Sequence, residues 1–156
     1  MNYIEKDIYF MQFALKEAQK AAMLGEIPVG ALMVADSKII ARGYNQTEML
    51  QDPTAHAEII ALTAASNYFN SKYLTNCTLY VTLEPCIMCS GALYWAQIKR
   101  LVFGATDPTR GYRRIIPFPL HPKTAVTDTI LAQESHEQLI EFFKKLRNPH
   151  PTGYCG

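Results

Sequence analysis

The sequence predicts an α/β protein, a three-layer α-β-α sandwich built around a mixed sheet of about five strands. Segments with helical spacing of apolar residues alternate along the chain with short β-rich segments. Strands separated by helices need crossover connections, which place helices on both faces of a sheet. One pair of strands joined by a short turn adds an antiparallel connection, so we expect the sheet to be mixed. No repeat, low-complexity tract or linker interrupts the 156 residues, which indicates one domain over residues 1–156.

The first part of the chain predicts a helix, a hairpin and a second helix. Residues 6–24 carry apolar side chains at spacings of three and four, and Gly25 would end that helix. Residues 29–34 and 38–44 are β-rich runs on either side of a short polar turn, as in a hairpin. Helical spacing returns over residues 57–68.

The second part continues the alternation. Residues 77–83 alternate as a strand does, residues 87–97 are compatible with a helix, and residues 100–104 form another β-rich run. Four prolines between positions 107 and 122 predict loop or short turns there. A last strand is expected over residues 126–131.

The last helix is expected over residues 135–146. Its apolar side chains predict an inward face made of Leu139, Phe142, Phe143 and Leu146. Phe142 and Phe143 are adjacent, so one of them should lie in the core while the other is free to meet a partner or RNA.

The composition limits the class of protein. Hydrophobic residues make up 49% of the chain and charged residues 19%, and no apolar run approaches the roughly 18 residues of a membrane span. The N-terminus lacks the order of a signal peptide, so we expect a cytoplasmic protein with no membrane partner. Of the four cysteines, only Cys86 and Cys89 form a C-x-x-C pair, which favours metal or redox chemistry over a disulfide framework.

The net charge is only +1, so the whole protein offers no strong field to attract a nucleic acid. Positive charge is concentrated locally instead. One basic segment contains Lys99, Arg100, Arg110, Arg113, Arg114 and Lys123 against the single acid Asp107, and a second contains Lys144, Lys145 and Arg147. The first segment is either a solvated loop or a surface for an anionic partner.

Two short motifs stand at predicted helix starts, and both carry side chains that bind metals. The first is His56-Ala57-Glu58, and the second runs from Pro85 through Cys86 to Cys89. A helix start favours the thiolate form of a cysteine, and two thiolates with one imidazole leave the fourth tetrahedral position of zinc open for water. Glu58 can accept a proton from that water and deliver it to a substrate, so we expect it to be catalytic and not a metal ligand.

Each motif alone is a weak signal, because an isolated H-x-E or C-x-x-C has several ordinary structural explanations. In this order, H-x-E followed by P-C-x-x-C is the signature of zinc-dependent nucleobase deaminases. The combination therefore predicts His56, Cys86 and Cys89 as ligands of one Zn²⁺ and Glu58 as the proton carrier.

Longer stretches make the resemblance more specific. The chain resembles the bacterial tRNA adenosine deaminases, which convert the wobble adenosine of a tRNA anticodon to inosine. The matching stretches begin at Pro28, Gly43, Asp52, Tyr80, Met88, Gly91 and Val102, and they cover most of residues 8–107. The resemblance implies a cytidine deaminase-like fold, one zinc per subunit, a homodimer with active sites near the subunit boundary, and the tRNA anticodon loop as partner.

The resemblance also implies which residues contact the RNA. Asn45 would hydrogen-bond the flipped base or its ribose, and Asp107 would lie at the mouth of the pocket beside the neighbouring nucleotides. The pocket wall and base edge would be contacted by Pro28, Val29, Leu83 and the backbone near Ala57. The anticodon loop would lie along Phe143, Lys144 and Arg147, since stacking and basic side chains grip single-stranded RNA.

Two features keep other functions open. The segment between Asp107 and Ile130 differs from the pattern of the tRNA deaminases, and Tyr94-Trp95-Ala96 resembles the small guanine deaminases of the same fold. A free-base deaminase acting on guanine or cytosine is therefore the alternative. Tyr94 and Trp95 are otherwise expected in the core or at a dimer interface. A nucleic-acid-binding module with a structural zinc is a third interpretation, against which Glu58 argues.

Overall fold

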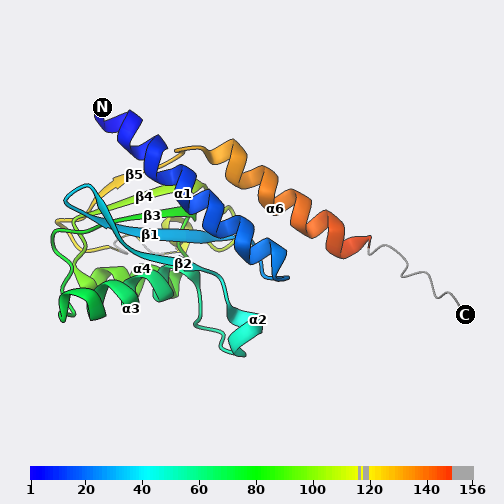
Figure 1. Ribbon diagram of the computed structural model, residues 1–156, viewed down its shortest axis with the longest axis horizontal. Coiled ribbons are helices and arrows are strands. Elements are labelled where there is room, and N and C mark those ends of the chain that lie inside the picture. The colour runs from blue at the N-terminus through cyan, green and yellow to red at the C-terminus, as the bar shows by residue number, and fades with distance from the viewer. Residues whose placement is uncertain (116, 118–119, 149–156) are drawn as a thin grey trace, which may run out of the picture.

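The computed structural model describes residues 1–115, 117 and 120–148, which form a sheet with helices on both faces (Figure 1). Its elements, in chain order, are α1 (Tyr3–Met23), β1 (Gly30–Ala35), β2 (Lys38–Tyr44), α2 (Thr47–Leu50), α3 (Ala57–Phe69), β3 (Thr78–Leu83), α4 (Ile87–Ala96), β4 (Arg100–Ala105), α5 (Tyr112–Ile115), β5 (Ala125–Thr127) and α6 (Ala132–Arg147).

The sheet is mixed and has five strands in the order β2-β1-β3-β4-β5. β1 runs antiparallel to both β2 and β3, whereas β3, β4 and β5 are parallel to one another. The hairpin turn between β1 and β2 is made by Asp36 and Ser37, whose φ angles are 48° and 60°. The parallel pairing brings the carboxyl ends of β3 and β4 to one edge of the sheet, with Leu83 opposite Ala105.

Two separate apolar layers confirm the predicted α-β-α sandwich. On one face α1 packs on the sheet through Phe10 and Met11, which meet Leu32 and Val34 of β1. On the other face the alternate β1 residue Met33 belongs to the layer under α3 and α4. Figure 1 shows α1 and α6 together on one side of the sheet and α3 and α4 on the other. The period of two along β1 therefore divides its side chains between the two layers.

A buried ion pair joins α1 to the centre of the sheet. The guanidinium of Arg100 on β4 donates to both carboxylate oxygens of Asp7 at 2.7 and 2.6 Å, and the Tyr80 hydroxyl donates to Asp7 at 2.9 Å. The Asp7 and Arg100 side chains are only 2% and 17% exposed. Arg100, one of the cations in the predicted basic segment, is therefore committed to an internal partner.

The end of the chain differs from the prediction in two respects. β5 stops at Thr127 and not at position 131, because Thr129 and Leu131 take left-handed φ angles of 59° and 52°, which no strand continues through. The helix then begins at Ala132, three residues earlier than expected.

The four-residue helices α2 and α5 were not predicted, since such short segments display no helical period.

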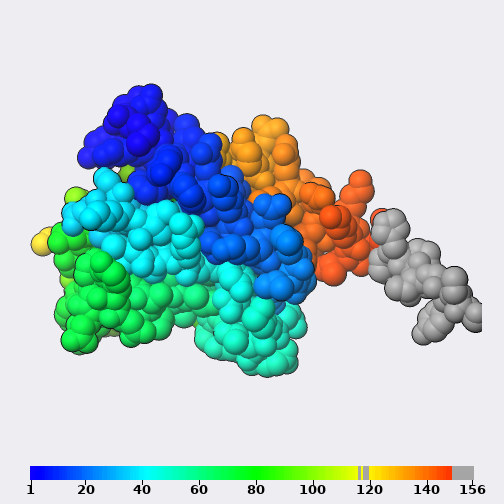
Figure 2. Space-filling model, in the orientation of Figure 1, coloured from blue at the N-terminus to red at the C-terminus, as the bar shows by residue number. Residues whose placement is uncertain are grey.

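The predicted inward face of the last helix is only partly correct. Leu139 and Phe142 are half-buried, whereas Phe143 is 40% and Leu146 60% exposed. The reason is that α6 packs on β3, β4 and α1 while its last turns project beyond the sheet (Figure 1 and Figure 2). The expectation that one of the two adjacent phenylalanines lies in the core is therefore met only in part, because Phe142 is half-buried and Phe143 is exposed. None of the helices in the described part of the chain is long and apolar enough to cross a membrane.

Candidate active site

Three metal-binding side chains converge where two helices begin. His56 is the residue before α3 and Cys86 is the residue before α4, and both have extended backbone angles typical of helix N-caps. Cys89 follows in the first turn of α4. The Nδ1 atom of His56 lies 3.6 Å from Sγ of Cys86 and 3.5 Å from Sγ of Cys89.

These distances fit a tetrahedral zinc ion. With Zn–S bonds of about 2.3 Å and Zn–N bonds of about 2.0 Å, tetrahedral angles separate the nitrogen and sulfur atoms by about 3.5 Å. All three donor atoms lie within 4.8 Å of one another. Two sulfurs and one imidazole nitrogen are also the donor types that zinc prefers, so the residues present fit the ion.

The two sulfurs differ in acidity. The neighbouring Cys89 thiol lowers the pKa of Cys86 to about 4, and His56 acts in the same direction. The pKa of Cys89 is raised, first by the Cys86 sulfur and then by burial. Metal ligands must be deprotonated, so one thiolate is ready at neutral pH and the other sulfur releases its proton when a metal binds.

Glu58 lies in the first turn of α3, two residues beyond His56, and its side chain is buried. Burial raises the pKa of Glu58 to about 7, while the charge on His56 opposes the rise. The cysteine sulfurs also act on this carboxyl group, which places it beside the cluster. A carboxyl group with a pKa near the working pH can both accept and release a proton.

The loop before α3 is held against the end of β2 by close backbone packing. A Cβ atom on Gly43 would lie 2.4 Å from the carbonyl oxygen of Ala57, so only glycine allows β2 to approach the start of α3 this closely. The N–H of Gln46 donates to the carbonyl of Ala55 at 3.0 Å. These contacts fix His56 and the first turn of α3 relative to the sheet.

Three predicted pocket residues, Pro28, Val29 and Asn45, lie together. The segment before β1 and the end of β2, which contain them, are hydrogen-bonded to each other. The N–H of Asn45 donates to the carbonyl of Val29 at 3.0 Å, and its side-chain amide donates to the carbonyl of Ile27 at 3.3 Å. Pro28 lies buried between these two carbonyls. The Asn45 side-chain oxygen accepts from the N–H of Thr47 at 3.3 Å, so this amide keeps one N–H and one lone pair for a ligand.

The remaining predicted residues fall into two groups. Ala57 in the first turn of α3, Leu83 at the end of β3, and Asp107 after β4 belong to the segments around the metal cluster. The second group lies on α6, which packs on the opposite face of the sheet. The structure therefore does not bring this group to the metal cluster. That group comprises the exposed residues Phe143, Lys144 and Arg147.

The sequence did not indicate that two further buried carboxylates brace the segments around the site. Glu26 accepts the N–H groups of Glu48 and Met49 at 2.7 and 3.3 Å and so braces the start of α2. Glu84, between β3 and Cys86, accepts N–H groups from the segment after β4. A charged residue inside an otherwise apolar run, such as Glu84 after Leu83, was the signal that could have found one of them.

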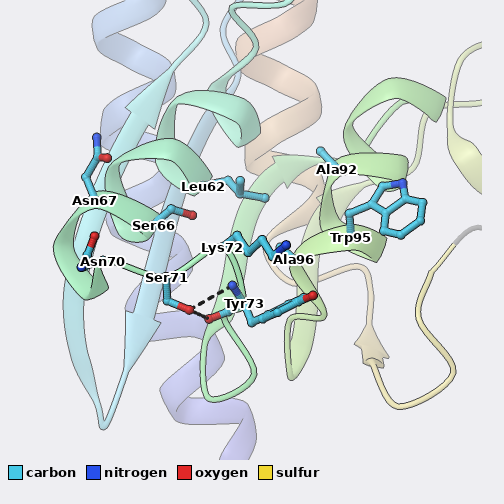
Figure 3. Close-up of a pocket in the computed structure, with 10 residues that line it drawn as sticks. All are labelled: Leu62, Ser66, Asn67, Asn70, Ser71, Lys72, Tyr73, Ala92, Trp95 and Ala96. Atoms are coloured by element: carbon cyan, nitrogen blue, oxygen red, sulfur yellow. Dashed lines mark hydrogen bonds between the residues drawn. The ribbon is translucent and has the colours of Figure 1, made fainter.

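A groove of about 680 Å³ lies on the outer side of α3 and α4 (Figure 3). Its lining comes from the end of α3, the residues that follow it and the end of α4, and includes Leu62, Asn70, Tyr73 and Trp95. Trp95 is 75% and Tyr94 37% exposed, so the expectation that they belong to the core is wrong. Both residues lie in the last turn of α4 and face outward. Their expected role at a subunit interface stays a prediction.

The fold and the cluster define a class of protein. A five-stranded mixed sheet, a His-Cys-Cys zinc site at two helix starts and a buried carboxylate beside it are found here in one chain. Residues 4–105 match the cytidine and deoxycytidylate deaminase zinc-binding region. The protein is thus a zinc-dependent hydrolase of the deaminase class.

Its relatives narrow the class. The chain is 45% identical over 144 residues to the tRNA-specific adenosine deaminase of Aquifex aeolicus, and the match covers 90% of this chain and 95% of that protein. It therefore belongs to the tRNA-specific adenosine deaminase family.

Solved structures agree with this assignment. A structure from a study of A-to-I editing by tRNA:A34 deaminases at the wobble position is 40% identical and superimposes with a TM-score of 0.78, covering 84% of this chain and 99% of that one. The guanine deaminase from Bacillus subtilis is 39% identical with a TM-score of 0.62, but covers only 68% of this chain and 66% of that one. The agreement with the tRNA deaminase structure therefore extends over more of both chains.

Proposed function

We propose that this protein hydrolytically deaminates the wobble adenosine of a tRNA anticodon to inosine. The observation that carries the proposal is the burial of Glu58 beside the His56, Cys86 and Cys89 cluster. A purely structural zinc site has no use for a buried acid at its side. The near full-length similarity to a tRNA-specific adenosine deaminase supports the choice of substrate.

The chain's own residues divide the chemistry between them. His56, Cys86 and Cys89 would hold the zinc ion, which when bound lowers the pKa of a water molecule to near neutrality. Glu58 moves two protons in turn: it takes one from the attacking water and gives it to the ring nitrogen, then takes the second from the same oxygen and gives it to the amine, which leaves as ammonia. Because Glu58 is buried, its carboxyl group exchanges protons with the substrate and not freely with bulk water.

The target base must leave the stack of the anticodon loop to reach this pocket. Asn45 retains one N–H and one lone pair that can bind the base or its ribose. Pro28, Val29, Leu83 and the backbone at Ala57 would wall the pocket, with Asp107 at its mouth. Along α6, the exposed Phe143, Lys144 and Arg147 offer a stacking surface and two cations to the RNA.

The direct test uses purified, zinc-loaded protein and an arginine tRNA with A at the wobble position. We expect inosine at that position, detected by sequencing of the RNA or by nucleoside chromatography. Absence of inosine under conditions in which a known tRNA deaminase reacts would contradict the proposal.

Free-base deamination is the second candidate, because a guanine deaminase shares 39% identity over part of the chain. The same preparation should therefore be assayed with free guanine and free cytosine. Ammonia release from a free base, without inosine in tRNA, would favour this alternative.

We also infer that the protein acts as a homodimer in the cytoplasm, where its tRNA substrate would be found. The exposed aromatic side chains on the outer side of α3 and α4 support a second copy as the partner of that face. They include Tyr68, Phe69, Tyr73, Tyr94 and Trp95. A single domain over residues 1–156 would then carry both the site and the interface.

A further inference from the structure

We propose that Glu84 is a positioning residue, which fastens residues 106–115 (the loop after β4 together with α5, called the loop below) to the start of α4 and so sets the RNA-facing wall of the active site. The functional part of this inference rests on the proposed tRNA deaminase activity. Its structural part, the attachment of the loop by Glu84, can be tested without any activity.

Glu84 is a carboxylate in a place that normally excludes charge. It follows the last residue of β3, stands two residues before Cys86, and is only 5% exposed. Burying such a group is costly unless it is hydrogen-bonded. Its N–H donates to the carbonyl of Ala105, which keeps its backbone aligned with the end of β4.

The partners of this carboxylate all come from the loop. Oε1 accepts the N–H of Asp107 at 3.3 Å, and Oε2 accepts the N–H of Arg113 at 3.1 Å. The Arg113 guanidinium lies 3.7 Å from Oε1. Glu84 therefore holds both ends of the segment from Asp107 to Arg113.

Only glycine fits at position 111, because there is no room for a Cβ atom between the loop and the Glu84 carboxylate. A Cβ atom there would lie 2.2 Å from Oε2 and 2.4 Å from Cδ of Glu84, and 2.6 Å from the carbonyl oxygen of Asp107. The φ angle of Gly111 lies outside the left-handed region, so an alanine would suit the backbone and fail only by collision. The middle of the loop is thus pressed directly onto the carboxylate.

The same loop is joined to the metal-binding turn. The N–H of Tyr112 donates to the carbonyl of Pro85 at 2.9 Å, and Gly111 forms a β-bridge with Cys86. Arg113 lies 4.8 Å above the Phe103 ring and pairs with Asp128 at 2.7 Å. Arg113 is therefore paired within the protein, although its side chain is 40% exposed, and its charge is largely balanced by Glu84 and Asp128.

The attachment by Glu84 affects function through Asp107, the predicted residue at the mouth of the pocket. Its carboxylate accepts the N–H groups of Thr109 and Arg110, both at 3.0 Å, which folds the loop into a tight turn. The position of that turn relative to Cys86 depends on Glu84 and Gly111. We therefore expect Glu84 to control how the nucleotides beside the target adenosine are bound, while the zinc ligands stay in place.

The experiment compares Glu84→Gln, Gly111→Ala and the double variant, with Glu134→Gln on the exposed part of α6 as a matched carboxylate control. The amide in Glu84→Gln presents N–H groups to a backbone N–H, so one bond is lost. We expect KM for a wobble-adenosine anticodon stem-loop to rise about tenfold in each single variant, since a bond to a charged group is broken. The value of kcat should change by less than about twofold, and zinc content should match the unaltered protein.

The double variant tests the contact itself. If Glu84 and Gly111 act through one contact, its effect on KM should fall well short of the product of the two single effects. Full multiplicativity, an unchanged KM, or a loss of zinc in either single variant would overturn the proposal. Glu134→Gln should leave KM and kcat unchanged.

Amide hydrogen exchange separates this inference from the proposed function. Exchange at Asp107 and Arg113 should accelerate in Glu84→Gln, whereas exchange in α1 should not change. If the unaltered protein makes no inosine, the proposed function fails while this readout still decides the attachment. If inosine is made but exchange and KM are unaffected, the role of Glu84 fails alone.

Discussion

The Nδ1 atom of His56 lies 3.5 Å from the Sγ atom of Cys89, although 33 residues separate them in the chain. Two helix starts create this proximity, because α3 and α4 both lie on one face of the sheet and begin at the same edge. The relationship turns two separate short motifs into one metal site. The first prediction concerns that site.

Replacing Cys89 by serine should abolish stoichiometric zinc binding, because the serine hydroxyl is a poor zinc ligand at neutral pH. Cys77→Ala is the control, since Cys77 is also buried but is the residue before β3. Zinc is measured by elemental analysis after gel filtration. Full zinc content in the Cys89 variant, or equal loss in both variants, would contradict the assignment.

Glu58→Ala should retain zinc and lose deamination by about 10²- to 10⁴-fold, the usual contribution of a positioned acid or base. The physical reason is that, in the proposed mechanism, Glu58 moves protons beside the cluster without binding the metal. Single-turnover rates with tRNA, together with zinc analysis, measure both quantities. A variant with its activity intact would refute the role and revive the interpretation of a structural zinc in a nucleic-acid-binding module.

The two cations at the end of α6 should contribute to RNA binding through phosphate contacts. Each of Lys144→Ala and Arg147→Ala should reduce the dependence of log Kd on log salt concentration by about 0.7, the value for one single-strand phosphate contact. Lys38→Ala, at the first residue of β2, is the control, because the adjoining β1-β2 turn lies at the other end of the molecule (Figure 1). Unchanged slopes in both α6 variants would place the RNA elsewhere.

In the proposed homodimer, Trp95→Glu should convert the dimer to a monomer, because it would place a carboxylate in the proposed interface. The measurement is the molar mass by light scattering after gel filtration. Met23→Glu is the matched control, since Met23 is also exposed but lies at the end of α1. The inference of a dimer through α3 and α4 fails if the unaltered protein is already a monomer or if Trp95→Glu remains a dimer.

Asp7→Asn should lower the free energy of unfolding by about 3 kcal/mol, because it leaves the Arg100 charge largely buried without its counterion. The exposed pair of Lys145 and Glu141, at 3.1 Å, provides the comparison. Glu141→Gln should change stability by no more than about 0.5 kcal/mol. Urea unfolding followed by circular dichroism measures both, and equal effects would show that burial of the Asp7 pair contributes nothing.

Much of the candidate site could be predicted from the sequence because its signals are local. His56 and Cys86 each precede a run of apolar residues with helical spacing, so both helix starts were visible before any contact was known. The order of strands and helices followed from the same periodicities. The predicted strands and helices agree with the structure to within one residue, except for the starts of α1 and α6, the end of β5 and the two four-residue helices.

By itself, then, the sequence determined the α/β class, the three zinc ligands and the carboxylate beside them. Only the tertiary structure decided which cations are paired within the protein, since Arg100 and Arg113 looked alike in the basic segment until Asp7, Glu84 and Asp128 were placed against them. It also decided that Trp95 faces outward. The physical reason is that periodicity reports on neighbours along the chain, whereas the partner of a buried charge is fixed by the order and register of strands that lie far apart in sequence.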